Sequence, residues 1–352
     1  MKILFGVFDW GLGHATRDTP LIEELLKRKH CVDIISTGRA LALLKSRFGK
    51  RCNYFDVPSI HVPYSNTRFF SLFFVKNIPK MLMSLNRARR ITEEIILKNN
   101  YDKVISDCRY DVYDGKDNSY FINHQLRFIS LPGAQGFVEK WLHNRMENYK
   151  LIIVPDFDKP NLTGDLSHNL KYIQKSKIRY IGILSHIRKL NCPEDISLFV
   201  SISGPEPQRT VLENKLLPLL NKFPGKIVVG LGKPELKHRS SRGRILFYSF
   251  LDSVKQEEYM NRARMVITRS GYTTMMELAE LGKAHALLIP TPGQTEQEYL
   301  ADIYEQRGYF HHVDQSEISL EHDLKKASKL NGFKVPWKTK KSIEKFIAAL
   351  SE

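Results

Sequence analysis

The stretch from Ile3 to Arg17, which reads ILFGVF followed by DWGLGHATR, decides the fold expected for this chain. Its first six residues are mostly large and apolar, which predicts a buried strand, and an amphipathic helix follows through Glu23 to Lys29. The glycines Gly11 and Gly13 let the backbone turn tightly, and the helix behind them offers unpaired N–H groups. This order predicts a doubly wound α/β sheet whose ligands bind beyond the carboxyl ends of the strands.

Strand-like runs of this kind recur along the chain, each followed by a longer amphipathic stretch. They lie at 2–8, 31–37, 101–107, 119–124 and 151–156 in a first series, and at 196–203, 226–230, 244–250, 265–268 and 285–289 in a second. Strands that alternate with crossover helices form parallel sheets, and 352 residues exceed the usual size of one core. We therefore expect two parallel-sheet domains facing across a cleft. The first covers residues 1–186, with a C-terminal helix at 336–352 packing back on it, and the second covers residues 187–335.

Composition and charge narrow the class of protein. The chain is 42% hydrophobic and 26% charged, which excludes a disordered chain, and its longest apolar run, about seven residues at 69–75, is too short to cross a bilayer. We expect a cytoplasmic protein. The four cysteines lie far apart without a C-x-x-C pair, which indicates neither a zinc site nor a disulfide framework.

The 54 Lys and Arg residues against 38 Asp and Glu leave a net charge of +16. Such a charge attracts nucleic acid, an anionic membrane surface or a small molecule that carries phosphate. Because the basic residues are dispersed and no recognition motif is present, we expect no nucleic-acid partner. The segment Arg68 to Arg90 combines aromatic with basic residues, so it fits either a peripheral membrane contact or a core helix with a solvated basic face.

His14 stands directly after Gly11-Leu12-Gly13, at the corner between the first strand and its helix. An imidazole there can accept a proton from an attacking hydroxyl, whereas the alternative is a histidine that only caps or packs the loop. The glycines also resemble part of a dinucleotide fingerprint. Its third glycine is replaced by Thr16, however, and no acidic residue ends the second strand, so an NAD site is disfavoured.

The second half contains two further strand ends with small residues. Ser203-Gly204 ends one strand before a helix, and Ser270-Gly271 ends another before a helix that contains Thr274. The exposed N–H groups of such helices suit a diphosphate. Glu277 lies about six residues further, roughly 9 Å along the helix axis, which is the distance to a ribose hydroxyl beside the diphosphate. An ordinary solvent-facing glutamate is the alternative, but the neighbours of Glu277 are apolar.

The strand at 285–289 is followed by Pro290-Thr291-Pro292-Gly293 and then by Gln294, Glu296 and Gln297. Prolines and glycine end the strand and place amide and carboxylate groups at the start of another helix. Amides that both donate and accept hydrogen bonds can read sugar hydroxyls. Helix capping alone would not need so many of these groups together.

Together these corners resemble the GT-B nucleotide-sugar glycosyltransferases, in particular the family-28-like branch that includes the bacterial lipid-II GlcNAc transferase MurG. Gly11-Leu12-Gly13-His14 is similar to the glycine loop with its proposed base, and Ser270-Gly271-x-x-Thr274-x-x-Glu277 to the donor helix whose glutamate holds the ribose. The resemblance implies two Rossmann-like domains in a GT-B fold. It also implies further site residues. These are Ser203 and Gly204 toward the donor, Leu251 against the uracil of the donor, Glu296 and Gln297 on the donor sugar, and His124 and Gln125 on the acceptor side.

Two departures from the family pattern concern the acceptor and the phosphate contact. The second glycine loop of the family is here Cys108-Arg109-Tyr110, and the arginine near the interdomain linker is here Ser185-His186. The stretch Asp156-Phe157-Asp158 spells a D-x-D metal motif of another glycosyltransferase fold, but it ends the last strand of the first half, away from the donor helix.

The resemblance implies an inverting transfer of a hexose or N-acetylhexosamine from a UDP-sugar, without metal or other cofactor, to a lipid-linked or glycan acceptor. His14 would be the base, and the reaction would belong to cell-envelope glycan synthesis at the inner face of the membrane. A UDP-sugar 2-epimerase of the same fold is the first alternative and an NAD-dependent oxidoreductase the second. The epimerase needs several carboxylates for proton abstraction, whereas only Glu277 and Glu296 are evident.

Overall fold

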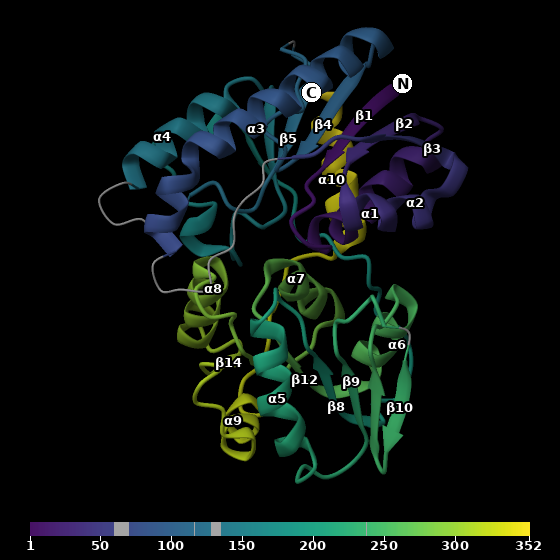
Figure 1. Ribbon diagram of the computed structural model, residues 1–352, viewed down its shortest axis with the longest axis vertical. Helices are drawn as coiled ribbons and strands as arrows, with labels where there is room; N and C mark the ends of the chain where they lie inside the picture. Colours follow the sequence, from purple (N-terminus) through teal and green to yellow (C-terminus); the bar gives the residue numbers. More distant parts are fainter. Residues whose placement is uncertain (60–69, 116, 128–134, 237) are drawn as a thin grey trace. The chain divides into compact units, whose positions relative to one another are not determined.

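A computed structural model of the chain describes residues 1–59, 70–115, 117–127, 135–236 and 238–352. The contacts between these residues divide the chain into two compact units. The N-terminal unit comprises Met1–Ser185 and Trp337–Glu352, and the C-terminal unit comprises His186–Pro336 (Figure 1).

The N-terminal unit is built on a seven-stranded sheet in the order β3-β2-β1-β4-β5-β6-β7, in which every pair is parallel. Its strands are β1 Lys2–Val7, β2 Cys31–Ser36, β3 Cys52–Asp56, β4 Lys103–Asp107, β5 Ser119–Ile122, β6 Leu151–Val154 and β7 Ile178–Tyr180. Its α-helices are α1 Gly13–Lys27, α2 Gly38–Phe48, α3 Phe70–Asn99, α4 Gln135–Met146 and α10 Thr339–Ser351. Short 3-10 turns lie at Gly49–Arg51, Gly164–Leu166 and Lys175–Lys177.

The C-terminal unit repeats this plan with the order β10-β11-β9-β8-β12-β13-β14. Its strands are β8 Ile196–Ser201, β9 Ile227–Gly230, β10 Arg239–Arg242, β11 Ile245–Tyr248, β12 Ala263–Thr268, β13 Ala286–Leu288 and β14 His311–His312. Only β10 among the described strands runs antiparallel to its neighbour. The helices are α5 Gln208–Leu220, α6 Ser253–Arg262, α7 Tyr272–Leu281, α8 Thr295–Gln306 and α9 Leu320–Ala327.

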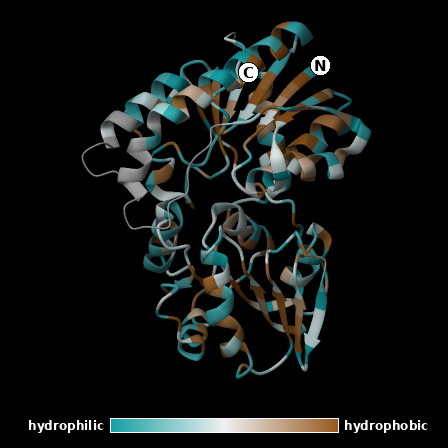
Figure 2. Cartoon of the chain, viewed as in Figure 1, coloured by the Kyte–Doolittle hydropathy of each residue, from teal (hydrophilic) through white to brown (hydrophobic). Residues whose placement is uncertain are grey.

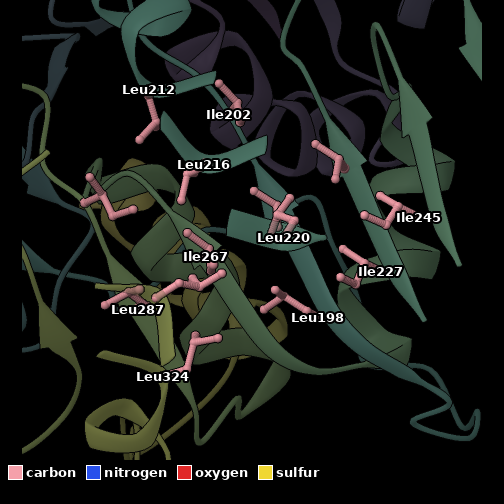
Figure 3. Packing of buried hydrophobic residues seen from close by; sticks show 14 of the residues in the cluster. Leu198, Ile202, Leu212, Leu216, Leu220, Ile227, Ile245, Ile267, Leu287 and Leu324 are labelled. Carbon is pink, nitrogen blue, oxygen red and sulfur yellow. The ribbon is translucent and has the colours of Figure 1, made fainter. Parts of the chain in front are cut away.

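Burial of apolar side chains on both faces of each sheet explains why these segments form strands. Figure 2 shows the hydrophobic residues gathered on the strands of each unit. In the C-terminal unit, Leu212, Leu216 and Leu220 repeat at four-residue spacing, so they share one face of α5. They belong to a buried cluster with strand residues that include Ile227 and Ile267 (Figure 3). Each fully buried side chain of this size contributes about 1.5–3 kcal/mol.

The last helix, α10, packs within the N-terminal unit. Trp337 Nε1 donates to the carbonyl of Ile181 at 3.0 Å, and Tyr120 Oη donates to the carbonyl of Leu350 at 3.2 Å. Gly182 has φ +91°, and the Trp337 ring fills the space that a Cβ would need there. A glycine is therefore required where the chain passes under the tryptophan.

The predicted fold class, two doubly wound parallel sheets, is confirmed, and all ten predicted strands are present. Sequence analysis missed β3, β7, β10 and β14. These four lie at the sheet edges, where one side needs no apolar partner; β10 reads RSSR and is fully exposed, and β14 has two residues. Such strands lack the apolar run by which the inner strands are recognised.

Candidate functional site

The order of strands in the N-terminal unit reverses between β1 and β4, and ligands of such sheets bind at that point. The chain leaves β1 through Gly11, which has φ +82°, and enters α1 at Gly13. His14 is thus in the first turn of α1. Asp107 is the last residue of β4. These residues and their contacts form the His14 corner.

A buried ion pair connects α1 to β4 in the His14 corner. His14 Nδ1 lies 2.7 Å from Asp107 Oδ2. The guanidinium of Arg17 binds both oxygens of the same carboxylate, with Nε 3.2 Å from Oδ2 and Nη2 against Oδ1. Arg17 is 1% exposed and Asp107 is 0% exposed, so the pair is shielded from water. Asp107 therefore both orients His14 and neutralises Arg17.

The same arginine reaches a third strand. Arg17 Nη1 lies 2.7 Å from His124 Nδ1, and His124 follows β5. The rings of His14 and His124 have centroids 6.3 Å apart. Gln125 lies beside them in a turn that Asn123 closes by accepting a hydrogen bond from the Gln125 N–H. The structure thus brings together His14 and His124, whereas Gln125 contributes only its backbone to the contacts found among the described residues.

Charges in the His14 corner shift the pKa values of its acids and base. Burial lowers the pKa of His14 below its usual value; Asp107 opposes this shift and Arg17 adds to it. Burial disfavours ionisation of Asp107, but Arg17 and then His14 outweigh it and hold the pKa of Asp107 well below its usual range. His14 is therefore a neutral imidazole at neutral pH, held by an ionised carboxylate.

Asp18 is the second buried carboxyl group of this corner. It is 0% exposed, and neither of its oxygens accepts a hydrogen bond from the residues that the structure describes. Arg17 Nε is 3.9 Å from Asp18 Oδ1. Burial, and then the charge of Asp107, raise the pKa of Asp18 well above its usual value. Asp18 therefore keeps its proton to higher pH than an exposed aspartic acid does.

We expect Asp18→Asn to raise the free energy of unfolding at pH 8 by roughly 1–3 kcal/mol. Since the folded state holds the Asp18 proton more tightly than the unfolded state, this group makes stability fall as pH rises above the unfolded pKa of about 4. Asparagine removes that fall, so wild type and variant should differ little at pH 4. All three tryptophans, Trp10, Trp141 and Trp337, belong to the N-terminal unit, so tryptophan fluorescence in guanidinium reports this unit.

The exposed Asp314→Asn, in the C-terminal unit, is the matched control and should leave the fluorescence transition unchanged. A D18N protein that is less stable than wild type at pH 8 would show that Asp18 is ionised in the fold.

A metal ion does not fit the His14 corner. His14, Asp107 and Cys108 form the one group with metal-ligand spacing among the described residues. Arg17 Nη2, however, lies 3.0 Å from His14 Nδ1 and 3.8 Å from Cys108 Sγ, so a cation already occupies this place. The D-x-D stretch fits no better, because Asp156 accepts hydrogen bonds from the backbone N–H groups of the turn that follows it. These donors are Phe157, Leu162 and Thr163.

The loop after β4 lacks the glycines of the family pattern but contains one residue in a conformation typical of glycine. Cys108 has φ +55°, the left-handed conformation that usually favours glycine. Its N–H donates to the carbonyl of Ile122 at 3.1 Å. Arg109 is buried in an ion pair with Asp111 and donates to the carbonyl of Val57 at 2.9 Å. Buried polar contacts thus hold a backbone that glycine would adopt more easily.

The C-terminal unit has its own reversal of strand order, between β8 and β12. Ser203 and Gly204 follow β8, whereas Ser270 and Gly271 follow β12 and precede α7. We call this group, with its neighbours on α7 and α8, the Ser270 corner. The N–H groups at the start of α7 therefore lie where such sheets bind anions.

Contacts between α7 and α8 organise the Ser270 corner. Ser270 is buried, and its Oγ donates to the carbonyl of Gln297 at 2.7 Å. Gln297 Oε1 accepts from the N–H of Thr291 at 2.9 Å, and its amide also contacts Gln294. A Cβ on Gly271 would lie 3.9 Å from Gln297 Nε2. Gln297 is thus beside the start of α7, and Glu296 is half-buried in the first turn of α8.

Arg269 is a residue of this corner that sequence analysis missed. It is 2% exposed, and it donates to the carbonyls of Ser203 at 3.2 Å, Gln208 at 3.0 Å and Ile289 at 3.1 Å. These carbonyls lie after β8, at the start of α5 and after β13, so one guanidinium joins three segments. Gly204 has φ +109°, and a Cβ there would lie 3.7 Å from Arg269 Nε. The position of this arginine directly before Ser270 was the available signal.

Glu277 is buried on α7, where it is 2% exposed. Its Oε2 accepts from Gln256 Nε2 at 3.2 Å, and its Oε1 lies 3.3 Å from His186 Nδ1. Burial raises the pKa of Glu277 to about 8, and the hydrogen bond from Gln256 opposes the shift. The solvent-facing alternative is thus wrong. His186, which stands where the family has an arginine, contacts this carboxylate.

The two remaining predicted residues lie near the same strand ends. Thr274 is half-buried on α7, three residues before Glu277 and so on the same side of the helix. Leu251 is 9% exposed between β11 and α6, and its Cδ1 would be 2.9 Å from a Cβ on Gly230. Leu251 therefore packs over the end of β9.

Two family models match the chain. The glycosyltransferase family 28 C-terminal domain matches residues 225–348, and glycosyl transferase family 1 matches residues 1–131. The chain is a glycosyltransferase with a C-terminal domain of family 28. Its matched segments contain both the His14 corner and most of the Ser270 corner.

Solved structures share the GT-B fold of this glycosyltransferase at low sequence identity. Acinetobacter baumannii MurG is 12% identical, with TM-score 0.56, over 100% of this chain and 95% of its own. A putative UDP-N-acetylglucosamine 2-epimerase from Listeria monocytogenes is 12% identical, with TM-score 0.58, over 100% and 96%. Arabidopsis thaliana UGT89C1 complexed with UDP-L-rhamnose is 12% identical, with TM-score 0.62, over 99% and 92%. No curated protein matches the chain in sequence.

The structure tests the membrane expectation only in part. Within the described ranges, no helix combines the length and the apolar character that crossing a bilayer requires. Arg68 and Phe69 of the proposed contact segment lie outside the described residues. From Leu85 onward, α3 packs against the core through Leu85, Ala88 and Ile96, while Lys80, Arg87 and Arg90 are exposed.

Proposed function

We propose that this MurG-like glycosyltransferase transfers a hexose or N-acetylhexosamine from a UDP-sugar to a lipid-linked or glycan acceptor, with inversion and without a metal. The observation that supports it best is the pair of strand-order reversals. One carries a neutral histidine bound to a buried carboxylate, and the other a helix N-terminus followed by a buried carboxylate, Glu277.

The Ser270 corner would hold the donor. The first N–H groups of α7 point out of the helix and would bind the diphosphate, and the partial positive charge of the helix end stabilises the charge on the leaving group. Glu277 would accept hydrogen bonds from the ribose, Leu251 would contact the base, and Gln297 would read the sugar. Arg269 would support these contacts, because it joins the loops that surround the corner.

The His14 corner would activate the acceptor. As the acceptor oxygen forms its bond to the anomeric carbon, its proton moves to His14, and the bond between that carbon and the diphosphate oxygen breaks with its electron pair on the diphosphate. Attack from the face opposite the leaving group inverts the anomeric centre. Asp107 would hold the imidazole in place and stabilise the positive charge that it gains.

Thermal shift assays with UDP, UDP-GlcNAc, UDP-glucose, dTDP, NAD and an oligonucleotide test the donor class. A ligand at 100 times its Kd stabilises the fold by about 2.7 kcal/mol, which is several degrees. We expect stabilisation by UDP and a UDP-sugar. Stabilisation by NAD or the oligonucleotide alone would contradict the proposal. Stabilisation by dTDP alone would indicate a donor that carries thymine instead of uracil.

The 2-epimerase alternative is favoured by the structural similarity to the Listeria monocytogenes protein. An epimerase that abstracts the proton at C2 incorporates deuterium there when UDP-GlcNAc is incubated with the enzyme in deuterated water, and it needs no acceptor. We expect no incorporation by proton NMR. Incorporation that Glu277→Gln abolishes would favour the epimerase.

We propose that the N-terminal unit, which would bind the acceptor, also contacts the membrane surface. The N-terminal unit carries most of the excess positive charge of the chain, and Lys80, Arg87 and Arg90 are exposed on α3. We expect the protein to float with vesicles that contain about 30% anionic lipid at low salt, and the triple glutamate variant of these residues to lose most of this binding.

A matched charge reversal in the C-terminal unit, Lys325→Glu with Lys326→Glu and Lys329→Glu, changes net charge equally and should still float. Equal loss in both variants would show that only total charge matters, and flotation that does not depend on anionic lipid would contradict an electrostatic contact.

A further inference from the structure

Arg17 is the hub of the His14 corner, although no sequence pattern singled it out. Its side chain is 1% exposed, and its guanidinium contacts the end of β4 through Asp107 and the segment after β5 through His124. It also contacts His14, which precedes it by about one turn of the same helix. These contacts determine where each imidazole carries its proton.

The contact with His124 settles the tautomer of that ring. A guanidinium donates hydrogen bonds and accepts none. Arg17 Nη1 is 2.7 Å from His124 Nδ1, so Nδ1 must be the acceptor. The proton of neutral His124 is therefore on Nε2. Protonation of Nδ1 would place two N–H donors against each other.

The contacts of His14 settle the opposite tautomer. Asp107 accepts hydrogen bonds and donates none when it is ionised, and its Oδ2 is 2.7 Å from His14 Nδ1. The His14 proton is therefore on Nδ1, and Nε2 carries the lone pair that can take a proton. Arg17 Nη2 is also 3.0 Å from this Nδ1, but Nη2 donates to Asp107 Oδ1, so the closer carboxylate decides the His14 tautomer. The nearby guanidinium charge opposes a positive charge on the His14 ring.

We infer that Arg17 is a positioning residue with three effects: it fixes the Nε2-protonated tautomer of His124, it holds the Asp107 carboxylate that fixes the opposite tautomer of His14, and it keeps His14 unprotonated and ready to accept a proton at Nε2. This inference rests on the proposed function only in calling His14 the base; the tautomers follow from the contacts alone. The charged or titratable groups around His14 are Asp107, Arg17, Asp18, Cys108 and His124.

Arg17 and Asp107 act on His14 in opposite directions. A carboxylate beside a histidine stabilises the imidazolium and raises its pKa. In part of the enzyme molecules His14 would then already carry the proton and could not act as the base. Burial of His14 is the largest effect against this rise, and the charge of Arg17 adds to it. The corner thus keeps the orienting hydrogen bond of Asp107 without the full rise in basicity.

The direct test is a long-range proton–nitrogen NMR spectrum of the full-length protein labelled with 15N-histidine. Assignment comes from His14→Gln and His124→Gln. At pH 8 we expect His14 with protonated Nδ1 and His124 with protonated Nε2. A protonated Nε2 on His14, a protonated Nδ1 on His124 or a doubly protonated His14 at pH 7 would overturn the inference. This measurement needs neither substrate nor variant of Arg17, so it stands apart from failure of glycosyl transfer.

Arg17→Gln is the complementary test. It keeps amide donors but removes the charge, and we expect the His14 titration, and the acid limb of the pH–rate profile with an established donor and acceptor, to move upward by about one pH unit. Arg17→Lys, which keeps the charge, should move them less and serves if Arg17→Gln does not fold. Arg47→Gln, an exposed arginine on α2, is the control. A rate loss at every pH with an unmoved acid limb would show a merely structural role and overturn the inference.

Discussion

Replacing His14 with asparagine is expected to lower kcat of glycosyl transfer by about 10²- to 10⁴-fold, the usual contribution of a general base. Asparagine can still donate a hydrogen bond to Asp107, so the corner should keep its packing while it loses the lone pair that accepts the proton. The KM for the donor should change little, because the predicted donor residues belong to the C-terminal unit.

Transfer of radiolabelled sugar at saturating donor measures this loss, and His322→Asn, an exposed histidine on α9, is the control. Retention of most of the rate by the H14N protein would rule out His14 as the base. A matched fall in donor affinity and in rate would instead indicate damage to the fold.

Glu277→Gln is expected to change donor binding and stability in opposite directions. A hydrogen bond to a charged group is worth about 1.5–3 kcal/mol. At pH 9, where Glu277 with its pKa of about 8 is ionised, loss of the carboxylate should therefore weaken UDP binding about 10- to 100-fold. Calorimetric titration with UDP measures this change. Wild-type affinity in the E277Q protein would contradict the assignment of Glu277 to the ribose.

The stability of the ligand-free protein should rise in the same variant at high pH. Burial raises the pKa of Glu277 to about 8, above its unfolded value of about 4.3. The folded state therefore binds the proton more tightly, and stability falls as pH rises from about 4 to 8. Glutamine lacks this fall, so E277Q should be more stable by on the order of 2 kcal/mol or more at pH 8, and similar to wild type at pH 4.

Differential scanning calorimetry at the two pH values tests this expectation, because the C-terminal unit contains no tryptophan. Glu317→Gln, an exposed glutamate of the same unit, is the control and should show neither effect. An E277Q protein that is less stable than wild type at pH 8 would show that the buried carboxylate stabilises the fold, through His186 or another partner.

The inner strands and their order of appearance were predictable because local patterns produce them. A buried parallel strand such as β1 needs apolar residues on both faces, and a helix such as α5 needs an apolar residue every third or fourth position. The exposed edge strand β10 has no such constraint, which is why the residues Arg239–Arg242 gave no signal. Glycine positions were less reliable, because Cys108 adopts the conformation that predicts a glycine.

The candidate residues were found where strands end, since small residues and polar groups stand out there after an apolar run. His14, Ser270, Gly271 and Glu277 were recognisable in this way. Asp107 was only the last residue of an expected strand. Its importance comes from β4 lying next to β1, which sequence separation conceals.

The amino-acid sequence by itself determined the two doubly wound sheets and the family, because apolar periodicity and a few short motifs are local properties of the chain. Tertiary structure alone decided the charge state of the His14 corner. Arg17 is 90 residues from Asp107 and 107 residues from His124, and only burial at a shared strand edge makes their interaction strong. A pKa depends on the dielectric surroundings and on charges within a few ångströms, and neither can be read from residues that are neighbours in sequence.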